Sequence, residues 1–374
     1  MKKVAIVGAG ISGLYLANEL IKNTQIDFKI FEKKENLNLN EGYGIQLSVN
    51  SVKLLNKIGF KNISASNVYY PTKVNFFQAN NLNKICEVDL KQFNYNLNRY
   101  TTLKRSTLIK FLFDNIPKEK IQFKASIENI ENKDKIEITN HNSTEKFDYL
   151  VVADGVFSKF RSKISEKDFE PFYNGYIALR AKLNKHEKDD ISVYMGSNFH
   201  YVIYPVNQTQ EYNFVSIIKR NLSDKEINNN NILNSEKFLK SIKDLISKKS
   251  KVNLENLIDI KCFPVFVSSK LPLPKYQNIF LCGDALFTFP PSFAQGASQS
   301  IEIANAILEN IINSNNTYKV KINKILLINR RSKLNQFVFH LSNPLIILLR
   351  NIILKFLSKN KKFLESYLGK VYRN

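Results

Sequence analysis

Tryptophan is absent from this 374-residue chain, and cysteine, histidine and glycine are scarce. The three cysteines, Cys86, Cys262 and Cys282, show no Cys-x-x-Cys spacing, and the four histidines lie far apart in the sequence. An odd number of scattered cysteines argues against a disulfide framework and favours reduced thiols in a cytosol-like compartment. Neither residue type has the spacing of metal ligands, so we expect no metal site.

Two kinds of segment are also missing. No apolar run reaches the ~18 residues of a transmembrane helix. The chain begins directly with a strand-like segment, which leaves no room for a signal peptide. Together these absences predict a cytoplasmic protein.

Acidic residues are too few to balance the basic ones, 33 against 55, and the net charge is +22. Such an excess first suggests nucleic acid or an anionic membrane as a partner. Most of the positive charge is lysine scattered among asparagine and isoleucine, and no arginine cluster or nucleic-acid module stands out. We interpret it as a solvated surface and expect no nucleic-acid partner.

Three of the twelve glycines, Gly8, Gly10 and Gly13, lie within six residues. They follow a run rich in β-branched residues and precede an apolar, helix-periodic segment at 14–21, which predicts a strand, a tight turn and a helix. In a dinucleotide site the first glycine allows the turn, the second lets the backbone approach a pyrophosphate, and the third lets the helix pack against the strand. The next predicted strand ends at Glu32, nineteen residues past Gly13, where a carboxylate can accept hydrogen bonds from a ribose. The alternative is an ordinary βαβ turn.

Two later strands end in the same way. The strand at 147–153 leads into Asp154-Gly155, and the strand at 278–282 leads into Gly283-Asp284, with a helix predicted at 295–312. Ligands of an open parallel sheet bind at the carboxyl ends of its strands. The three motifs therefore point to one crevice.

The rest of the chain predicts a second, antiparallel sheet. Period-two alternation recurs between residues 171 and 271, interrupted by a helix at 235–246, and residues 67–99 contain a hairpin. We predict a discontinuous first domain at 1–66, 100–170 and 272–312. The second domain covers 67–99 and 171–271, and a helical C-terminal segment covers 313–374.

In these motifs and their order, the chain resembles the class A flavin-dependent aromatic monooxygenases of the p-hydroxybenzoate hydroxylase type, near the salicylate and ubiquinone-biosynthesis hydroxylases. The resemblance covers residues 1 to about 310. It implies an α/β fold with a Rossmann-like FAD-binding domain, an inserted antiparallel-sheet substrate domain and a helical C-terminus. The residues that it assigns to FAD are Gly8, Gly10, Gly13, Glu32, Arg105, Asp154, Gly155, Gly283, Asp284, Gln295, Gly296 and Ala297.

Two arginines have competing interpretations. Arg105 matches the arginine of the FAD-binding helix in this family, and Arg161 follows the Asp-Gly motif. A planar guanidinium suits a pyrophosphate. For each the alternative is a surface ion pair.

The resemblance implies hydroxylation of a phenolic ring with NAD(P)H and O2, through a flavin C4a-hydroperoxide. Because the sequence holds only one G-x-G-x-x-G, we expect NAD(P)H to bind transiently over the FAD domain. The substrate is either a small aromatic acid, favoured by the loop at 42–47 and by Tyr204-Pro205-Val206, or a polyprenylated phenol of quinone biosynthesis. The rival hypothesis is a non-catalytic, membrane-associated FAD-binding protein.

No catalytic base can be named from the sequence. His200 and Tyr204 are the weak candidates for lining the substrate pocket, against the alternative that they are ordinary strand residues facing core or solvent. Phe287 stands where the family commonly has histidine, and Ala294 where it commonly has glycine. Ala294 would be strained if its φ were positive.

A basic amphipathic helix is predicted at 344–364. It either docks its apolar face on the body of the protein, the interpretation that we favour, or lies in a membrane interface on the inner face of a membrane. The oligomeric state is left open.

Overall fold

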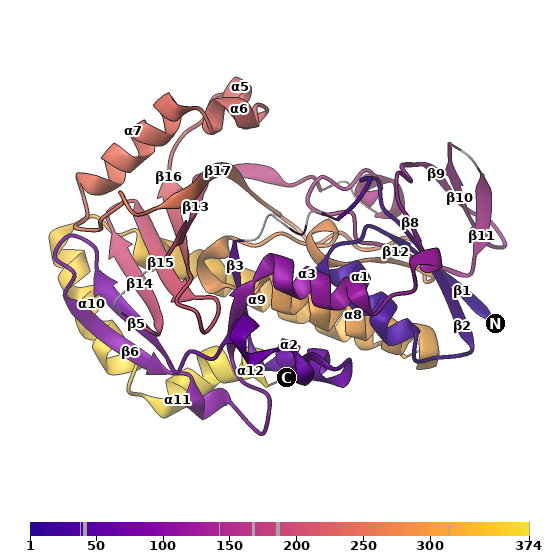
Figure 1. The fold of residues 1–374 in the computed structure, drawn as a ribbon, viewed down its shortest axis with the longest axis horizontal. Coiled ribbons are helices and arrows are strands. Elements are labelled where there is room, and N and C mark those ends of the chain that lie inside the picture. Colours follow the sequence, from indigo (N-terminus) through magenta and orange to yellow (C-terminus); the bar gives the residue numbers. More distant parts are fainter. Residues whose placement is uncertain are drawn as a thin grey trace.

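The computed structural model describes residues 1–37, 39, 43–141, 143–166, 169–184, 188–313 and 315–373. A parallel sheet lies at one end of the elongated molecule and a larger sheet at the other, with helices α1, α3 and α8 between them (Figure 1). Of the 42–47 loop singled out in the sequence, Gly42 lies outside the described residues.

The parallel sheet has the strand order β18-β12-β1-β2-β8. Its strands are β18 (Ile279–Leu281), β12 (Tyr149–Val152), β1 (Lys2–Val7), β2 (Ile26–Phe31) and β8 (Ile121–Gln122). Helices α1 (Ile11–Leu20), α3 (Arg105–Asp114) and α8 (Gly296–Asn313) pack beside one another over this sheet. An antiparallel layer of β9 (Ile127–Asn132), β10 (Ile136–Asn140) and β11 (Thr144–Phe147) contacts β1. The central strands are therefore buried, which explains why they appear in the sequence as continuous apolar runs.

The larger sheet has seven strands in the order β17-β13-β16-β15-β14-β5-β6. Its strands are β5 (Lys73–Gln78), β6 (Lys84–Asp89), β13 (Phe172–Leu183), β14 (Ile191–Gly196), β15 (Phe199–Pro205), β16 (Tyr212–Lys219) and β17 (Ile258–Val267). The hairpin β5-β6 thus joins strands from much later in the chain. All pairs are antiparallel except β14 with β5, so the predicted antiparallel sheet is mixed at this one position.

Helices cover both faces of the seven-stranded sheet. On one face lie α5 (Asp224–Ile227), α6 (Asn230–Leu233) and α7 (Glu236–Ser247), and α7 buries Phe238, Ile242 and Ile246 against the sheet. On the other face lie α9 (Thr317–Phe339), α10 (Pro344–Leu357), α11 (Lys361–Leu364), a π-helical turn (Glu365–Gly369) and α12 (Lys370–Tyr372).

A short segment connects the two sheets. Strand β3 (Gly44–Leu47) pairs with β7 (Thr101–Lys104), which also pairs with β4 (Val68–Tyr69), and β3 leads into α2 (Val49–Lys57). At its start the Gly44 N–H donates to Asn213 Oδ1 of β16 at 2.7 Å. Just after its end the Ser48 N–H donates to Ser298 Oγ of α8 at 3.1 Å. This segment therefore holds the start of α8 near one face of the seven-stranded sheet.

Helix α10 corrects the favoured expectation for the C-terminus. Its apolar side faces solvent, with Leu345 78% and Phe356 67% exposed, and its one buried residue is Arg350. The expected docking of the apolar face on the protein body is therefore wrong.

Ala294 occupies a left-handed turn directly before α8, with φ +51° and ψ 35°. The methyl group of an L-residue crowds the backbone in this conformation. Of the two outcomes expected for this substitution, the structure has the strained one.

His200 of β15 and His340, which follows α9, form a buried contact between the large sheet and the C-terminal helices. His200 Nδ1 lies 2.7 Å from His340 Nε2, and His200 packs edge-on to Phe339. Burial, and to a lesser extent His340, lowers the pKa of His200 well below its usual value. Burial and the positive charge of Lys219 together lower the pKa of His340 to about 3. Both rings are neutral, so one nitrogen donates and the other accepts. His200 therefore lies in the protein core.

We expect Ala294→Gly to raise the free energy of unfolding by about 0.5–1 kcal/mol, since relief of about 1–2 kcal/mol of strain exceeds the entropy cost of glycine in the unfolded chain. Urea denaturation checks this. Ala297→Gly, a matched change inside α8, should instead destabilise. If both variants lower the free energy of unfolding by the same amount, Ala294 is unstrained.

We also expect the free energy of unfolding to fall as the pH drops below about 6.5. Both histidines are then protonated in the unfolded chain but stay neutral in the folded protein. The sign follows from lowered folded-state pKa values: their stabilisation is complete above the unfolded value and is lost below it. Each proton that only the unfolded chain binds changes the free energy of unfolding by about 1.4 kcal/mol per pH unit. The free energy of unfolding, measured from pH 7 to 5, should change less steeply with pH in His340→Gln than in the wild type. The control His141→Gln, at an exposed histidine, should leave this slope unchanged. An unchanged slope in His340→Gln would contradict the assignment.

Candidate cofactor and substrate site

The three strand-end motifs lie beside one another, as the sequence predicts, because β18, β12 and β1 are adjacent and parallel. Gly8 has φ +108°, and a Cβ atom there would lie 2.4 Å from the carbonyl oxygen of Ala153. A Cβ atom on Gly13 would lie 2.1 Å from the carbonyl oxygen of Gly8. Glycine is thus required at both positions, by the turn at Gly8 and by close helix–strand packing at Gly13.

The third motif contacts the first. Gly283 has φ +61°, and a Cβ atom there would lie 2.8 Å from Ser12 Oγ, at the start of α1. Ser12 is buried and was not singled out in the sequence, since a lone serine carries no signal of its own. The Gly283-Asp284 turn therefore lies against the glycine-rich turn.

Arg161 ties the second motif to the third. Its side chain is 1% exposed and donates to the carbonyl oxygens of Ala285 at 2.8 Å, Val156 at 2.9 Å and Asp284 at 3.0 Å. It also donates to the carbonyl oxygen of Gly155 at 3.5 Å and pairs with the exposed carboxylate of Glu170 at 3.2 Å. Neither expectation for Arg161 matches this arrangement, since the guanidinium is buried and its donors are directed at main-chain carbonyl groups. It acts as a cross-link between two loops.

Other glycines at these turns have free space around their main chain. Around Gly10, Gly155 and Gly296 a Cβ atom would meet nothing within 4 Å. Gly10 precedes α1 without a side-chain cap, and Gly296 begins α8, so main-chain N–H groups of two helix N-termini are free to bind an anion. Asp154 Oδ1 and Gln295 Nε2, at these turns, are among the buried side-chain polar atoms of the described residues that have no hydrogen-bond partner. A cradle of this kind fits a dinucleotide with a pyrophosphate and polar rings.

Glu32 lies at the end of β2 beside the glycine-rich turn. Its Oε2 accepts from the Ala9 N–H at 2.8 Å and its Oε1 from the Lys34 N–H at 2.9 Å. Each carboxylate oxygen can accept a further hydrogen bond. The main chain therefore holds the carboxylate in a fixed position where it can still bind a ribose hydroxyl group.

Asp284 and Arg105 lie close enough to interact electrostatically. The Asp284 carboxylate is exposed to solvent but surrounded by protein atoms, and this partial desolvation raises its pKa, while Arg105 and Arg161 oppose the rise. Arg105 is the exposed first residue of α3, and its N–H donates to the carbonyl oxygen of Tyr43 at 2.9 Å. Gln295, Gly296 and Ala297 lie at the start of α8. The three strand-end motifs, which contain many of the FAD-assigned residues, thus lie side by side at the ends of β1, β12 and β18.

The face of the large sheet that β3 approaches has a partly exposed row of side chains. Val202, Val215 and Arg180 are paired across β15, β16 and β13, and all three are only partly buried. Among the described residues the Arg180 side chain makes no hydrogen bond or ion pair; its guanidinium carbon lies 6.0 Å from the centroid of the Tyr43 ring. Arg180 was not singled out in the sequence. Its position two residues after Ala178, in a strand with period-two alternation, places both residues on the same face of the sheet and could have indicated it.

Tyr204 shares this face but is buried at 3% exposure. Burial raises its pKa, while Arg180, Gln46 and Asn213 oppose the rise. Gln46 Oε1 also accepts from the Tyr100 hydroxyl at 2.8 Å. Tyr204 is therefore a neutral phenol beside β3.

Phe287 packs against Phe289 with ring centroids 5.2 Å apart. It keeps the start of α8 apolar.

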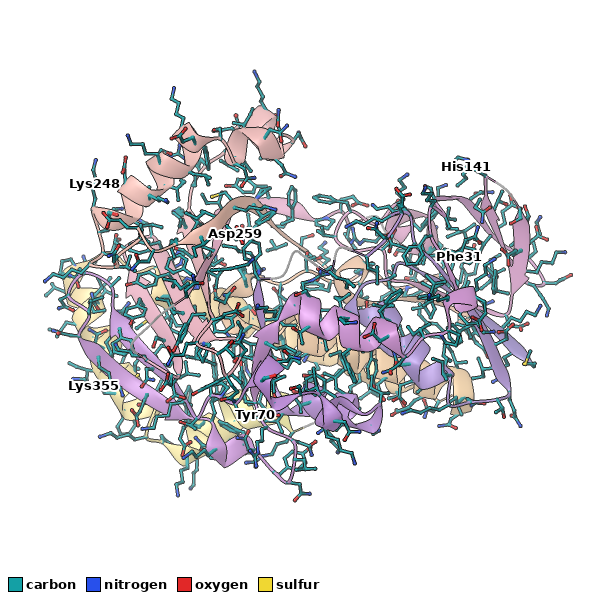
Figure 2. All side chains as sticks on the ribbon, viewed as in Figure 1. Phe31, Tyr70, His141, Lys248, Asp259 and Lys355 are labelled. Atoms are coloured by element: carbon teal, nitrogen blue, oxygen red, sulfur yellow. The ribbon has the colours of Figure 1, made fainter. Side chains whose placement is uncertain are left out.

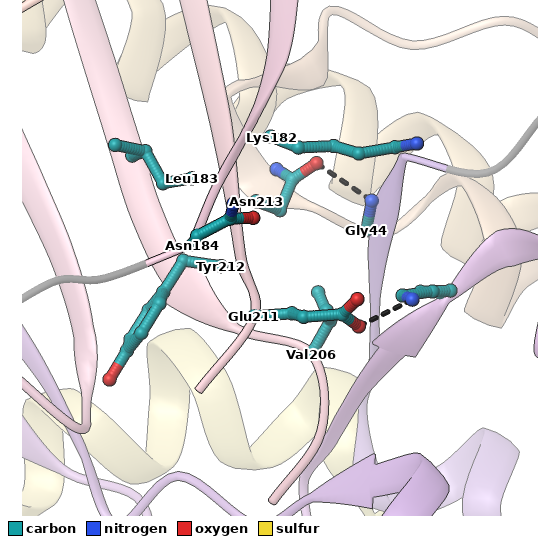
Figure 3. Close-up of a pocket in the computed structure, with 9 residues that line it drawn as sticks. Gly44, Lys182, Leu183, Asn184, Val206, Glu211, Tyr212 and Asn213 are labelled. Carbon is teal, nitrogen blue, oxygen red and sulfur yellow. Dashed lines mark hydrogen bonds and ion pairs between the residues drawn. The ribbon is translucent and has the colours of Figure 1, made fainter. Parts of the chain in front are cut away.

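A small pocket adjoins Gly44 where β3 crosses the sheet (Figure 3). Its walls include Lys182, Glu211 and Asn213, and its volume of about 20 Å³ holds about one water molecule. This pocket is too small for an aromatic ring.

Comparisons with known proteins agree with this geometry. The chain is 29% identical over 190 residues to the FAD-dependent monooxygenase subE of Metarhizium robertsii, covering 45% of this chain and 56% of that protein. It is 24% identical to a salicylate hydroxylase of Pseudomonas putida, covering 57% and 54% of the two chains. The matches thus span about half the length of these curated relatives.

The fold is shared with solved flavoproteins. The structure of Klebsiella pneumoniae HpxO complexed with FAD and uric acid superposes with a TM-score of 0.79 at 16% identity, over 99% of this chain and 96% of that chain. This likeness confirms the predicted fold class.

The family of FAD binding domains matches residues 1–313, which contain all three strand-end motifs. The protein therefore belongs to the FAD-binding domain family.

Proposed function

We propose that the protein is an FAD-dependent monooxygenase that hydroxylates an aromatic acid with NAD(P)H and O2. One observation carries the proposal: the cofactor cradle and the partly exposed row of the large sheet are joined by one short strand. From Gly44 at the sheet to Ser48 at α8 there are four residue steps, or about 14 Å of extended chain. That distance accommodates a flavin ring and a substrate ring. The monooxygenase names of the matched relatives support the same activity.

Each group of residues would have a distinct task. The glycine-rich turn and Glu32 would hold the ADP half of FAD, and Asp284 and Arg105 its middle. Bound FAD would supply the redox chemistry, accepting a hydride from reduced nicotinamide and activating O2. The free N–H groups at the start of α8 would stabilise negative charge nearby, and the buried Phe287 and Phe293 would exclude water. With one G-x-G-x-x-G in the chain, the nicotinamide would bind transiently.

Arg180 favours an acid as the substrate. Its guanidinium is partly buried and has no carboxylate partner among the residues that the structure describes, and a ligand carboxylate could pair with it through two parallel hydrogen bonds. Val202 and Val215, beside it, offer an apolar surface for a ring. The substrate that fits this row is a small aromatic carboxylate.

A polyprenylated phenol remains the second candidate, supported by the exposed apolar side of α10. The non-catalytic alternative rests on Ala294 and Phe287 alone. Neither substitution removes a residue of the cradle, so we favour the enzyme.

We expect the purified protein to contain FAD and to oxidise NADH or NADPH faster when aromatic carboxylates such as salicylate or hydroxybenzoates are added. Arg180→Gln should raise the KM of the carboxylate roughly 10–100-fold, because a charged hydrogen bond contributes about 1.5–3 kcal/mol. The matched control is Arg220→Gln, since Arg220 packs on Phe238, a core residue of α7. Steady-state kinetics provide the measurement. If the protein retains FAD but oxidises neither NADH nor NADPH with any aromatic compound, the non-catalytic alternative is supported instead.

We expect Asp284→Ala to weaken FAD binding by about 10–100-fold, since a carboxylate that accepts from a cofactor hydroxyl group is lost. Equilibrium dialysis of the apoprotein with FAD measures the change. Asp114→Ala, at an exposed aspartate paired with Lys110, should bind FAD normally. Wild-type affinity in Asp284→Ala would remove Asp284 from the cofactor site, and a protein that binds no FAD would overturn the proposed function.

A further inference from the structure

Helix α10 presents a wide apolar surface to solvent. Seven of its side chains are at least 45% exposed. They are Leu345, Ile346, Leu348, Leu349, Ile352, Ile353 and Phe356. Their spacing of three and four residues puts them on one side of the helix. An exposed apolar patch of this size on a soluble protein indicates an interaction surface.

Arg350 holds this surface outward. Its side chain is 5% exposed and points into the protein, where Nη2 donates to Gln78 Oε1 at 2.8 Å and Nη1 to the carbonyl oxygen of Val338 at 3.3 Å. Asn343 caps the first turn by accepting from the N–H groups of Leu345 and Ile346. Burying a guanidinium while exposing leucine and isoleucine reverses the arrangement of an ordinary surface helix. The rotation of α10 is therefore set by specific polar contacts.

The same part of the chain carries much of the positive charge. Residues 310–364 contain eleven lysines and arginines and no aspartate or glutamate, which equals half of the net charge of +22. Lys355, Lys359, Lys361 and Lys362 are exposed on or just after α10, and Figure 2 shows Lys355 at the outer edge of the molecule. Four of the eleven thus lie exposed beside the apolar patch, whereas Arg331 and Arg350 are buried and Lys324 is paired with Glu302.

We propose that α10 is the site at which the protein docks on an anionic lipid bilayer. The helix lies in the plane of the interface, with its seven apolar side chains among the upper acyl chains and the flanking lysines on the headgroups. None of the helices within the described ranges is long and apolar enough to cross a membrane, so the contact is peripheral.

Charge favours a bilayer over a second copy of the chain. A twofold contact through α10 would bring two copies of the exposed Lys355, Lys359, Lys361 and Lys362 together, and residues 310–364 contain no acidic residue to offset them. An anionic surface instead attracts each nearby lysine, by about 1 kcal/mol in typical cases. The proposal does not depend on the enzymatic function, since it concerns binding alone.

The test is flotation of the FAD-loaded full chain with vesicles of equimolar phosphatidylglycerol and phosphatidylcholine, and with phosphatidylcholine alone. We expect the protein to float with the anionic vesicles only. Leu349→Ser with Ile352→Ser should lower the partition coefficient at least about tenfold, from lost apolar insertion. Lys355→Gln with Lys359→Gln should lower it roughly fivefold per lysine.

The matched control is Leu97→Ser with Leu273→Ser, at two leucines that are 63% and 48% exposed outside α10; it should float like the wild type. Absence of flotation would overturn the proposal, as would equal flotation of the α10 double variant. Binding to phosphatidylcholine alone that is as strong as to anionic vesicles would refute the charge requirement. A dimer by analytical ultracentrifugation that dissociates in the α10 double variant, without flotation of the wild type, would identify the face as a homodimer interface.

Discussion

The cofactor crevice depends on the buried side chain of Arg161. Its guanidinium binds carbonyl groups of two loops that follow different strands of the parallel sheet, at residues 156 and 284–285. Without it, these carbonyl oxygens would lack donors in a region closed to water, at a cost of about 1–3 kcal/mol each. Because Gly283 in turn contacts Ser12 beside the glycine-rich turn, this one side chain helps to set the shape of all three motifs.

A second constraint acts between the two sheets. The segment of β3 is held at Gly44 by Asn213 and at Ser48 by Ser298, and Gly44 has no room for a side chain, since a Cβ atom would lie 2.8 Å from Tyr204 Cε2. The large sheet therefore approaches the start of α8 closely, and Arg180 lies near the space between them. The strained backbone at Ala294 occurs at this same junction, where strain is often associated with function.

The C-terminal helices combine two opposite roles. Tyr372 and Leu364 pack into the core beside Phe93 and Tyr100, which closes the sheet face against solvent. Between α9 and these buried residues, α10 turns its apolar side outward. A helix that is rigidly attached and yet exposes leucine and isoleucine is suited to contact an apolar phase without unfolding.

The glycine turns at Gly8 and Gly13 and the position of the Glu32 carboxylate were predictable from the sequence, because each depends on local backbone geometry and on spacing along the chain. The adjacency of the three strand ends was predictable as well, since the carboxyl ends of parallel strands meet at one edge. The burial of Arg161, the pairing of His200 with His340 and the outward side of α10 were not predictable, and for Arg161 and α10 the expectations were wrong. Those features depend on which residues distant in sequence meet: Arg161 binds carbonyl groups more than a hundred residues away, and Arg350 binds Gln78. An arginine or an amphipathic pattern defines what a residue can bind, but only the packing of distant segments decides whether it faces a ligand, the core or the solvent.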